Sequence, residues 1–157
     1  MTASQKYLDT LKLYYEEEIE GEAYFYGIAD RLEDPDQKEK MRVMAQVETY
    51  AAAAVAPLLE KYSLTPRSAE ELHASGRKQA EGSSTDWGEL IAGMQKTFPG
   101  YIDDFEGLEA MAPPEDLPAL KVLTAHEVAA IDFLELEAAN APDSAAPMHH
   151  YLATGTA

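Results

Sequence analysis

Apolar residues recur at alternating spacings of three and four along four long stretches of this chain, and proline-containing segments separate the stretches. This spacing gathers the apolar residues on one face of an α-helix. The period-two alternation typical of β-strands is absent, and Val, Ile and Thr are sparse. The sequence therefore predicts an all-α fold. Its four long helices are expected at about residues 4–33, 36–62, 86–111 and 115–139.

The connections between the expected helices differ greatly in length. Asp34-Pro35-Asp36 and Ala112-Pro113-Pro114 are short breaks, because proline cannot continue a helix, and each predicts an antiparallel hairpin. The connection over residues 63–85 is long enough to run back along a helix of roughly 40 Å. Ser68 and Glu71 form a capping-box pattern, which favours a short helix within that connection. The sequence predicts a four-helix bundle of two hairpins joined by a long crossover.

Other prolines predict local breaks. Pro57 is expected to kink the second helix or to loosen one of its hydrogen bonds, and Phe98-Pro99-Gly100 should interrupt the third helix or bend it sharply. Pro142 and Pro147 lie beyond the fourth helix. We therefore expect one domain over residues 1–139, followed by an irregular tail over residues 140–157.

Charge and composition exclude several classes of function. The chain of 157 residues has 12 basic and 29 acidic side chains, a formal net charge of −17, which argues against nucleic acid or anionic membrane as a partner. The lack of cysteine removes disulfides, thiolate zinc sites and iron–sulfur clusters. No apolar run approaches the ~18–20 residues of a membrane span, and the start does not resemble a signal peptide. We expect a cytoplasmic protein.

Two glutamates lie on otherwise apolar helix faces. Glu48 is the only charged residue over residues 43–59, and Glu127 is the only carboxylate over residues 122–131. Carboxylates are rarely buried without a partner, because removing a lone charge from water costs several kcal/mol. Two such residues on two helices predict a shared partner in the protein interior.

The two expected hairpins also match in spacing. Glu22 precedes Glu48 by 26 positions, and Tyr101 precedes Glu127 by the same number. If the hairpins are equivalent, Glu22, Glu48 and Glu127 converge midway along the bundle. Glu18 lies one helical turn from Glu22 on the same face and is a secondary candidate.

With this layout and these glutamates, the chain resembles the ferritin-like superfamily, particularly its rubrerythrin-like carboxylate di-iron proteins. The resemblance covers about residues 4–139. In that family, a Glu on the first and third helices and a Glu-x-x-His on the second and fourth hold two metals. Glu22 matches the first-helix ligand, with Glu18 as the secondary match. Glu48 and Glu127 match the Glu of the two Glu-x-x-His motifs.

Other family ligands are replaced in this chain. The two histidine positions and the third-helix Glu position are Ala51, Ala130 and Tyr101. Asp104 lies one turn from the third-helix position and is a further secondary candidate. His126 adjoins Glu127 but is rotated by about 100° around the helix. We therefore do not expect His126 to replace a missing ligand, although it too is a secondary metal candidate.

Two functional hypotheses follow. The resemblance implies a protein that binds iron or another divalent metal through the bundle-core carboxylates, with oxidoreductase activity left open. The alternative is a metal-free ferritin-like bundle that acts as a binding or assembly module. In that case the carboxylates would form a hydrogen-bonded network with nearby tyrosines, namely Tyr15, Tyr50 or Tyr101.

Aromatic residues off the main helix faces favour a homodimer through the first two helices. These residues are Tyr14, Tyr24, Tyr26 and Tyr50.

Overall fold

The computed structural model describes residues 2–157, and within that range it contains helices and no strands. The all-α class is confirmed. The helices are α1 (Gln5–Arg31), α2 (Pro35–Lys61), α3 (Ala69–Glu81), α4 (Trp87–Met111), the short 3₁₀ helix η1 (Pro114–Asp116), α5 (Leu117–Ala138) and α6 (Ala146–Thr154). None of the helices formed by residues 2–157 combines the length and apolarity that a membrane span requires.

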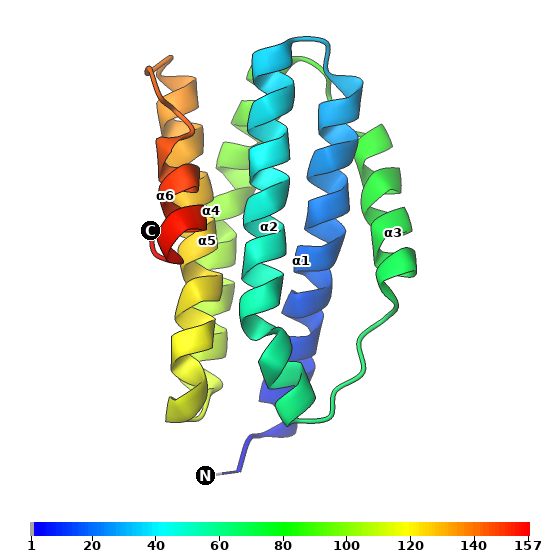
Figure 1. Cartoon of the computed structure of the whole chain (residues 1–157), viewed down its shortest axis with the longest axis vertical. Helices are drawn as coiled ribbons and strands as arrows, with labels where there is room; N and C mark the ends of the chain where they lie inside the picture. Colours follow the sequence, from blue (N-terminus) through cyan, green and yellow to red (C-terminus); the bar gives the residue numbers. More distant parts are fainter. Residues whose placement is uncertain (1) are drawn as a thin grey trace.

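The four long helices α1, α2, α4 and α5 lie side by side (Figure 1). The pairs α1–α2 and α4–α5 are antiparallel hairpins with short connections. The segment between α2 and α4 runs back along the length of the long helices and contains α3, so α2 and α4 point in the same direction (Figure 1). Helix α3 packs against α1, and α6 packs against α5 and α2. Two short helices therefore cover faces of the long ones.

Polar side chains define where the long helices begin. Ser4 and Asp86 accept hydrogen bonds from the backbone amides of the first turns of α1 and α4. Asp34 caps α2 in the same way, and Pro35 follows at a position where its missing N–H costs nothing. Ser68 accepts from the Glu71 amide at 3.2 Å, as the capping-box pattern predicted for a short helix.

The interior prolines do not break the helices, so the third long helix is one helix and not two. Helix α4 continues through Pro99, and α2 continues through Pro57. Both prolines are exposed. On the solvent side of a helix, water can bond to the carbonyl that the proline leaves without a donor.

The prediction of an irregular C-terminal tail is also wrong. Residues 146–154 form α6, whose Met148 and Tyr151 side chains are fully buried. Pro147 lies in the first turn of α6, where proline is compatible with a helix, so it does not act as a breaker. Gly155 ends the helix in the left-handed conformation (φ 70°), which favours glycine.

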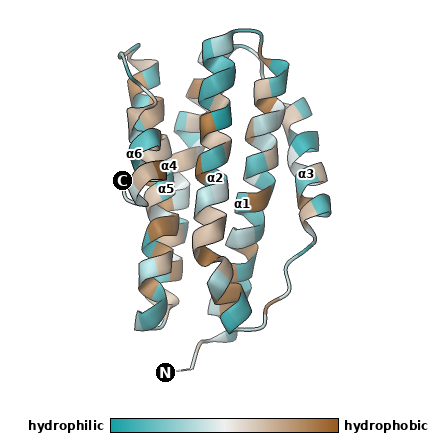
Figure 2. Ribbon diagram, in the orientation of Figure 1, coloured by the Kyte–Doolittle hydropathy of each residue, from teal (hydrophilic) through white to brown (hydrophobic). Residues whose placement is uncertain are grey.

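The interior contains two apolar clusters, one toward each end of the long helices. One includes Leu11, Val55 and Leu120, and the other includes Phe25, Met44 and Phe133. Each long helix carries both hydrophilic and hydrophobic residues, as amphipathic helices do (Figure 2). Between the two clusters lies a layer that contains ionisable side chains.

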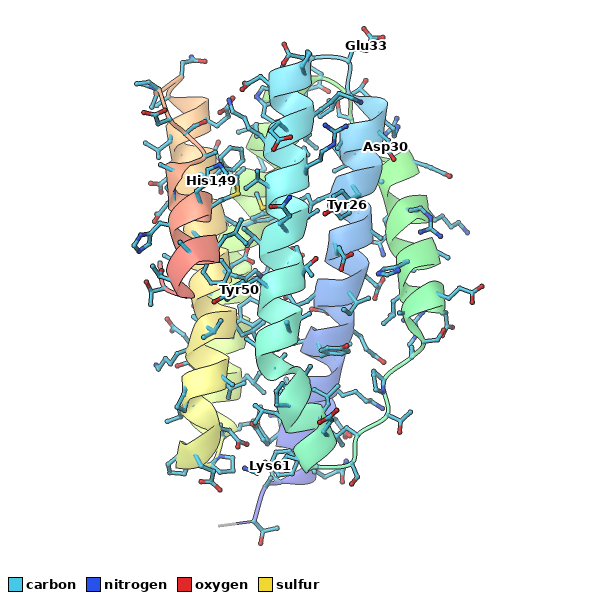
Figure 3. All side chains as sticks on the ribbon, viewed as in Figure 1. Tyr26, Asp30, Glu33, Tyr50, Lys61 and His149 are labelled. Atoms are coloured by element: carbon cyan, nitrogen blue, oxygen red, sulfur yellow. The ribbon has the colours of Figure 1, made fainter. Side chains whose placement is uncertain are left out.

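One polar network fixes the end of the molecule that carries Lys61, labelled in Figure 3. The buried Asp116 carboxylate accepts hydrogen bonds from the Tyr7 hydroxyl (2.8 Å), the Tyr62 hydroxyl (2.5 Å) and the Lys61 ammonium (2.6 Å). Burial opposes the charged carboxylate, but these three donors outweigh it and lower the pKa of Asp116. The network ties α1 and α2 to the start of α5.

We expect Asp116→Ala to lower the free energy of unfolding by roughly 3 kcal/mol, because the buried Tyr7 hydroxyl loses its acceptor. The matched control is Glu115→Ala, an exposed neighbour, which should change it by no more than about 0.5 kcal/mol. Because the folded-state pKa of Asp116 is lowered, the charged carboxylate adds to the free energy of unfolding above its unfolded-state pKa. This contribution is lost as the pH falls through the lowered folded-state pKa. Urea unfolding at pH 7 and at acid pH tests this. Curves of wild type and Asp116→Ala that differ equally at both pH values would contradict it.

Candidate functional site

A histidine and carboxylates from three helices meet in the layer between the two apolar clusters. His126 Nε2 of α5 lies 2.9 Å from Glu18 Oε2 of α1 and 3.0 Å from Glu48 Oε2 of α2. Glu127 Oε2, also from α5, is 3.5 Å away. We call these four residues the His126 cluster. The ligand atoms of Glu18, Glu48 and His126 all lie within 4.8 Å of one another, which is close enough to hold one metal ion.

The hydrogen bond of His126 Nδ1 determines the orientation of the ring and the protonation of Nε2, the atom that faces the carboxylates. Nδ1 is hydrogen-bonded to the backbone carbonyl oxygen of Leu123, one turn earlier in α5. A carbonyl can only accept, so Nδ1 carries a proton. In the neutral ring, Nε2 is then unprotonated and directs its lone pair toward the carboxylates. This arrangement, with Nδ1–H on a carbonyl and Nε2 free, is the usual one for a metal-binding histidine.

Several carboxylate oxygens in the cluster lack a hydrogen-bond partner. Among residues 2–157, Glu18 Oε2, Glu48 Oε2 and Glu127 Oε1 are buried and have no hydrogen bond of normal geometry. The first two lie 2.9 and 3.0 Å from His126 Nε2, so they have a donor only when that nitrogen is protonated, and a neutral ring leaves all three oxygens unpaired. Buried polar atoms are nearly always paired, so three unpaired oxygens in one place call for a cation or a proton.

Burial and mutual repulsion raise the proton affinity of the cluster. Burial raises the pKa of Glu127 to about 8, with His126 opposing the shift and Glu48 adding to it. Burial and the neighbouring Glu18 raise the pKa of Glu48 well above its usual value. Burial disfavours charged His126, but the Glu18 and Glu48 carboxylates outweigh this and raise its pKa. Without another cation, the cluster therefore holds protons that these groups would lose in water.

Aromatic rings and one glycine shape the space around the cluster. The His126 ring lies 5.4 Å from the Phe105 ring of α4 and 6.4 Å from the Tyr151 ring of α6, measured between centroids. Tyr151 donates its hydroxyl proton to the Val122 carbonyl at 3.0 Å, which fixes its ring over α5. At Gly21, a Cβ atom would lie 2.9 Å from Glu48 Oε1, so the absent side chain makes room for the Glu48 carboxylate.

Of the three primary candidates, Glu48 and Glu127 belong to the cluster and Glu22 does not. The predicted convergence of Glu22 with them is wrong. The Glu22 carboxylate faces α3, where its Oε1 lies 4.0 Å from His73 Nε2. Helix α3 packs along this side of α1 and turns Glu22 away from α2 and α5. Glu18, one turn earlier and only 4% exposed, takes the expected place.

The secondary candidates have opposite outcomes. Asp104 is exposed on α4 and does not join the cluster. His126 is its central residue, so the expectation that its side chain would point away from the carboxylates is wrong. The buried face of α5 is wide enough to include both His126 and Glu127, which are 2% and 5% exposed. It is this wide because α6 covers one side of α5. The signal for this wide face in the sequence was the spacing of three and four between its residues. The face comprises Leu123, His126, Glu127, Ala130, Phe133 and Leu134.

The tyrosines expected to bond to the glutamates have other surroundings. Within the described residues, Tyr15, Tyr50 and Tyr101 form no hydrogen bond to Glu18, Glu48 or Glu127; the Tyr50 ring packs against Tyr151 at 5.1 Å instead. Of the tyrosines considered for a dimer, Tyr14 packs against Phe105 and Tyr24 is hydrogen-bonded to Ser83. Tyr26 and Tyr50 remain partly open, at 38% and 36% exposure (Figure 3).

No protein-family model, no curated protein and no solved structure matches this chain. The chemistry of the His126 cluster and its surroundings is therefore the basis for inferring a function.

Proposed function

We propose that this chain is a ferritin-like helical protein that binds one divalent transition-metal ion through Glu18, Glu48 and His126. The observation that carries the proposal is the set of unpaired, buried carboxylate oxygens around His126 Nε2. A metal ion would satisfy these oxygens and the Nε2 lone pair together. The Leu123 carbonyl already holds the ring in the tautomer that such binding requires.

The donor set fits an ion of intermediate hardness. One imidazole nitrogen with two carboxylates suits Fe²⁺, Mn²⁺ or Zn²⁺ better than Ca²⁺, which takes oxygen ligands, or Cu⁺, which takes sulfur. The charges also balance, because two carboxylates neutralise a divalent ion. In the metal-free protein, burial raises the pKa of Glu127 to about 8, so this third carboxyl adds no negative charge there at neutral pH.

The donor set favours one metal over the two of the di-iron family. A second ion would need the ligands that Ala51, Ala130 and Tyr101 do not supply. Iron or manganese held with open coordination positions supplies redox chemistry with oxygen, which is the basis for proposing oxidoreductase activity. Glu18, Glu48 and His126 would hold the ion, and the Phe105 and Tyr151 rings flank the His126 ring.

The second candidate is a metal-free binding or assembly module. It is favoured by the short distances from His126 Nε2 to the Glu18 and Glu48 carboxylates, since a protonated ring could compensate them without a metal. The raised pKa of His126 agrees with this arrangement. A homodimer through α1 and α2, using the open Tyr26 and Tyr50, belongs to this hypothesis and stays a prediction.

Glu18 and Glu22 provide a matched pair for the test. We expect Glu18→Gln to weaken Mn²⁺ binding by about 100-fold, because it removes a charged ligand. Glu22→Gln, one turn away on the same helix, should leave the affinity within about twofold, because Glu22 faces α3. Calorimetry on protein purified without a histidine tag gives the affinity, and the electron paramagnetic resonance spectrum of Mn²⁺ reports its ligands.

The exposed pair His149 and His150 requires a control, because adjacent histidines bind metals adventitiously. Replacing both with alanine should leave the tight Mn²⁺ site intact. Equal loss of binding in Glu18→Gln and Glu22→Gln, or loss in the His149/His150 double variant alone, would contradict the proposed site.

A further inference from the structure

A large cavity adjoins the His126 cluster. It has a volume of about 760 Å³ and lies between α1 and α4, which contact each other sparsely. Glu18, Glu48 and Glu127 line its inner end. The exposed residues Gly93 and Tyr101 also line it, so the cavity is open to solvent. A volume of this size accommodates a small organic molecule.

The carboxyl-bearing and basic side chains that line the cavity are all glutamates. Its ionisable carboxylates are Glu17, Glu18, Glu20, Glu48, Glu89 and Glu127. Within residues 2–157, no lysine, arginine or histidine side chain lines it. His126 Nε2 lies behind the inner end of this wall, 2.9 Å from Glu18 Oε2, and Arg67 Nη1 lies 3.8 Å from Glu20 Oε1 at the outer edge. Beside them, the buried Glu127 Oε1 has no hydrogen-bond donor.

Aromatic side chains form much of the remaining wall. They are Tyr24, Phe25, Phe98, Tyr101 and Phe105. Aromatic faces attract organic cations through their quadrupoles, most strongly where water is excluded. A wall of carboxylates and rings therefore attracts a positive charge carried on an apolar body. An anion would be repelled, and a neutral apolar molecule would leave the carboxylates desolvated without compensation.

We propose that the cavity binds an organic cation, an ammonium group attached to an apolar or aromatic body, with the charged end directed toward Glu18 and Glu127. That the organic cation is the substrate of a metal centre rests on the proposed function. Binding of the cation needs only the cavity. The ammonium group supplies the donors that the unpaired oxygens lack. The apolar body contacts the aromatic wall.

Three probes of similar size and different charge test the proposal: 2-phenylethylammonium, 2-phenylethanol and 3-phenylpropanoate. Calorimetry with metal-free and with Mn²⁺-loaded protein should detect binding of the ammonium in at least the metal-free form. The alcohol should bind at least about tenfold more weakly, a difference of about 1.4 kcal/mol, and the carboxylate should not bind. Equal affinity for the three probes, or no binding of the ammonium in either form, would overturn the proposal.

Two glycines of α4 provide the variant and its control. A Cβ atom at Gly93 or Gly107 would meet nothing within 4 Å, so the helix tolerates a larger residue at both positions. Gly93 lines the cavity, and Gly107 does not. We expect Gly93→Phe to weaken binding of the ammonium by about tenfold or more, and Gly107→Phe to change it by less than about twofold. Equal effects of the two variants would count against the cavity as the site.

Mn²⁺ affinity, measured on the same samples, separates this proposal from the metal proposal. Gly93→Phe should bind Mn²⁺ as wild type does, which also shows that the variant is folded. If the ammonium binds and Mn²⁺ does not, the cavity proposal stands and the metal proposal fails. If Mn²⁺ binds and the ammonium does not, the cavity proposal fails alone.

Discussion

Addition of Zn²⁺ or Mn²⁺ to the metal-free protein should raise its Tm by roughly 8–15 °C. A ligand that binds only the folded state at about 1,000 times its Kd adds about 4 kcal/mol of stability, and about 1 kcal/mol shifts the Tm of a domain of this size by about 2–4 °C. The shift arises because the ion pairs with Glu18, Glu48 and His126, which in the metal-free protein lie together in the interior with unpaired oxygens. Thermal melting with a metal ion or with excess chelator measures it.

Glu48→Gln shows whether the shift comes from the His126 cluster. The variant keeps the shape of the side chain and removes its charge, so it should lose the metal-dependent shift. In excess chelator it should melt at or above the wild-type Tm, because burial and Glu18 disfavour the charged form of Glu48. A wild-type Tm that is indifferent to metal and chelator, together with a stabilised Glu48→Gln, would leave the metal-free module as the better hypothesis.

The long helices could be predicted from the sequence because their signals are local. Apolar spacing, capping residues and proline-containing connections act within a few residues of one another, and Ser4, Asp34 and Asp86 cap helices where the chain indicated helix starts. Glu48 and Glu127 could be recognised as interior carboxylates for the same reason. Each interrupts an apolar face, and that interruption is visible without knowing which helix lies opposite.

The errors at the site have a shared cause in the two short helices. Helix α3 packs on α1 and draws Glu22 toward His73, so the buried carboxylate is Glu18. Helix α6 packs on α5 and widens its buried face, so His126 points inward beside Glu127. Neither effect is visible in the spacing along the long helices alone. Which side of a helix is buried depends on every neighbour, including segments that look like linkers or tails.

Within residues 2–157, the buried side-chain oxygens that lack a hydrogen bond all belong to the His126 cluster. Asp116, a deeply buried carboxylate outside the cluster, receives three donors and has a lowered pKa. Glu127, at a similar depth, has an unpaired oxygen and a pKa raised to about 8. The same fold thus supplies hydrogen-bond donors to the buried Asp116 carboxylate and leaves an oxygen of Glu127 without one. This contrast is expected of a structural network in the first case and of a binding site in the second.

In excess chelator, the free energy of unfolding should fall as the pH rises from about 5 to 8. The folded-state pKa of Glu127 is raised to about 8, and those of Glu48 and His126 are raised as well. A group with a raised folded-state pKa contributes stability that is fully present below its unfolded-state pKa and is lost as the pH rises through the folded-state value. For Glu127 alone, this loss is on the order of 4 kcal/mol between pH 4.5, the ordinary pKa of a glutamate, and pH 8. Saturating metal should reverse the slope, because acid protonates the ligands and displaces the ion.

Glu127→Gln isolates this effect, because glutamine has a similar shape and does not ionise. In chelator, the variant and wild type should be about equally stable near pH 5, where Glu127 is protonated in the folded protein. Above pH 8 the variant should be more stable by a few kcal/mol. In wild type, Glu127 then loses its proton, and the folded protein must hold a buried negative charge. Glu106→Gln, at an exposed position of α4, should follow the wild-type curve. Urea unfolding at several pH values makes the comparison. Parallel curves for wild type and Glu127→Gln would mean that Glu127 does not hold a proton in the metal-free folded protein.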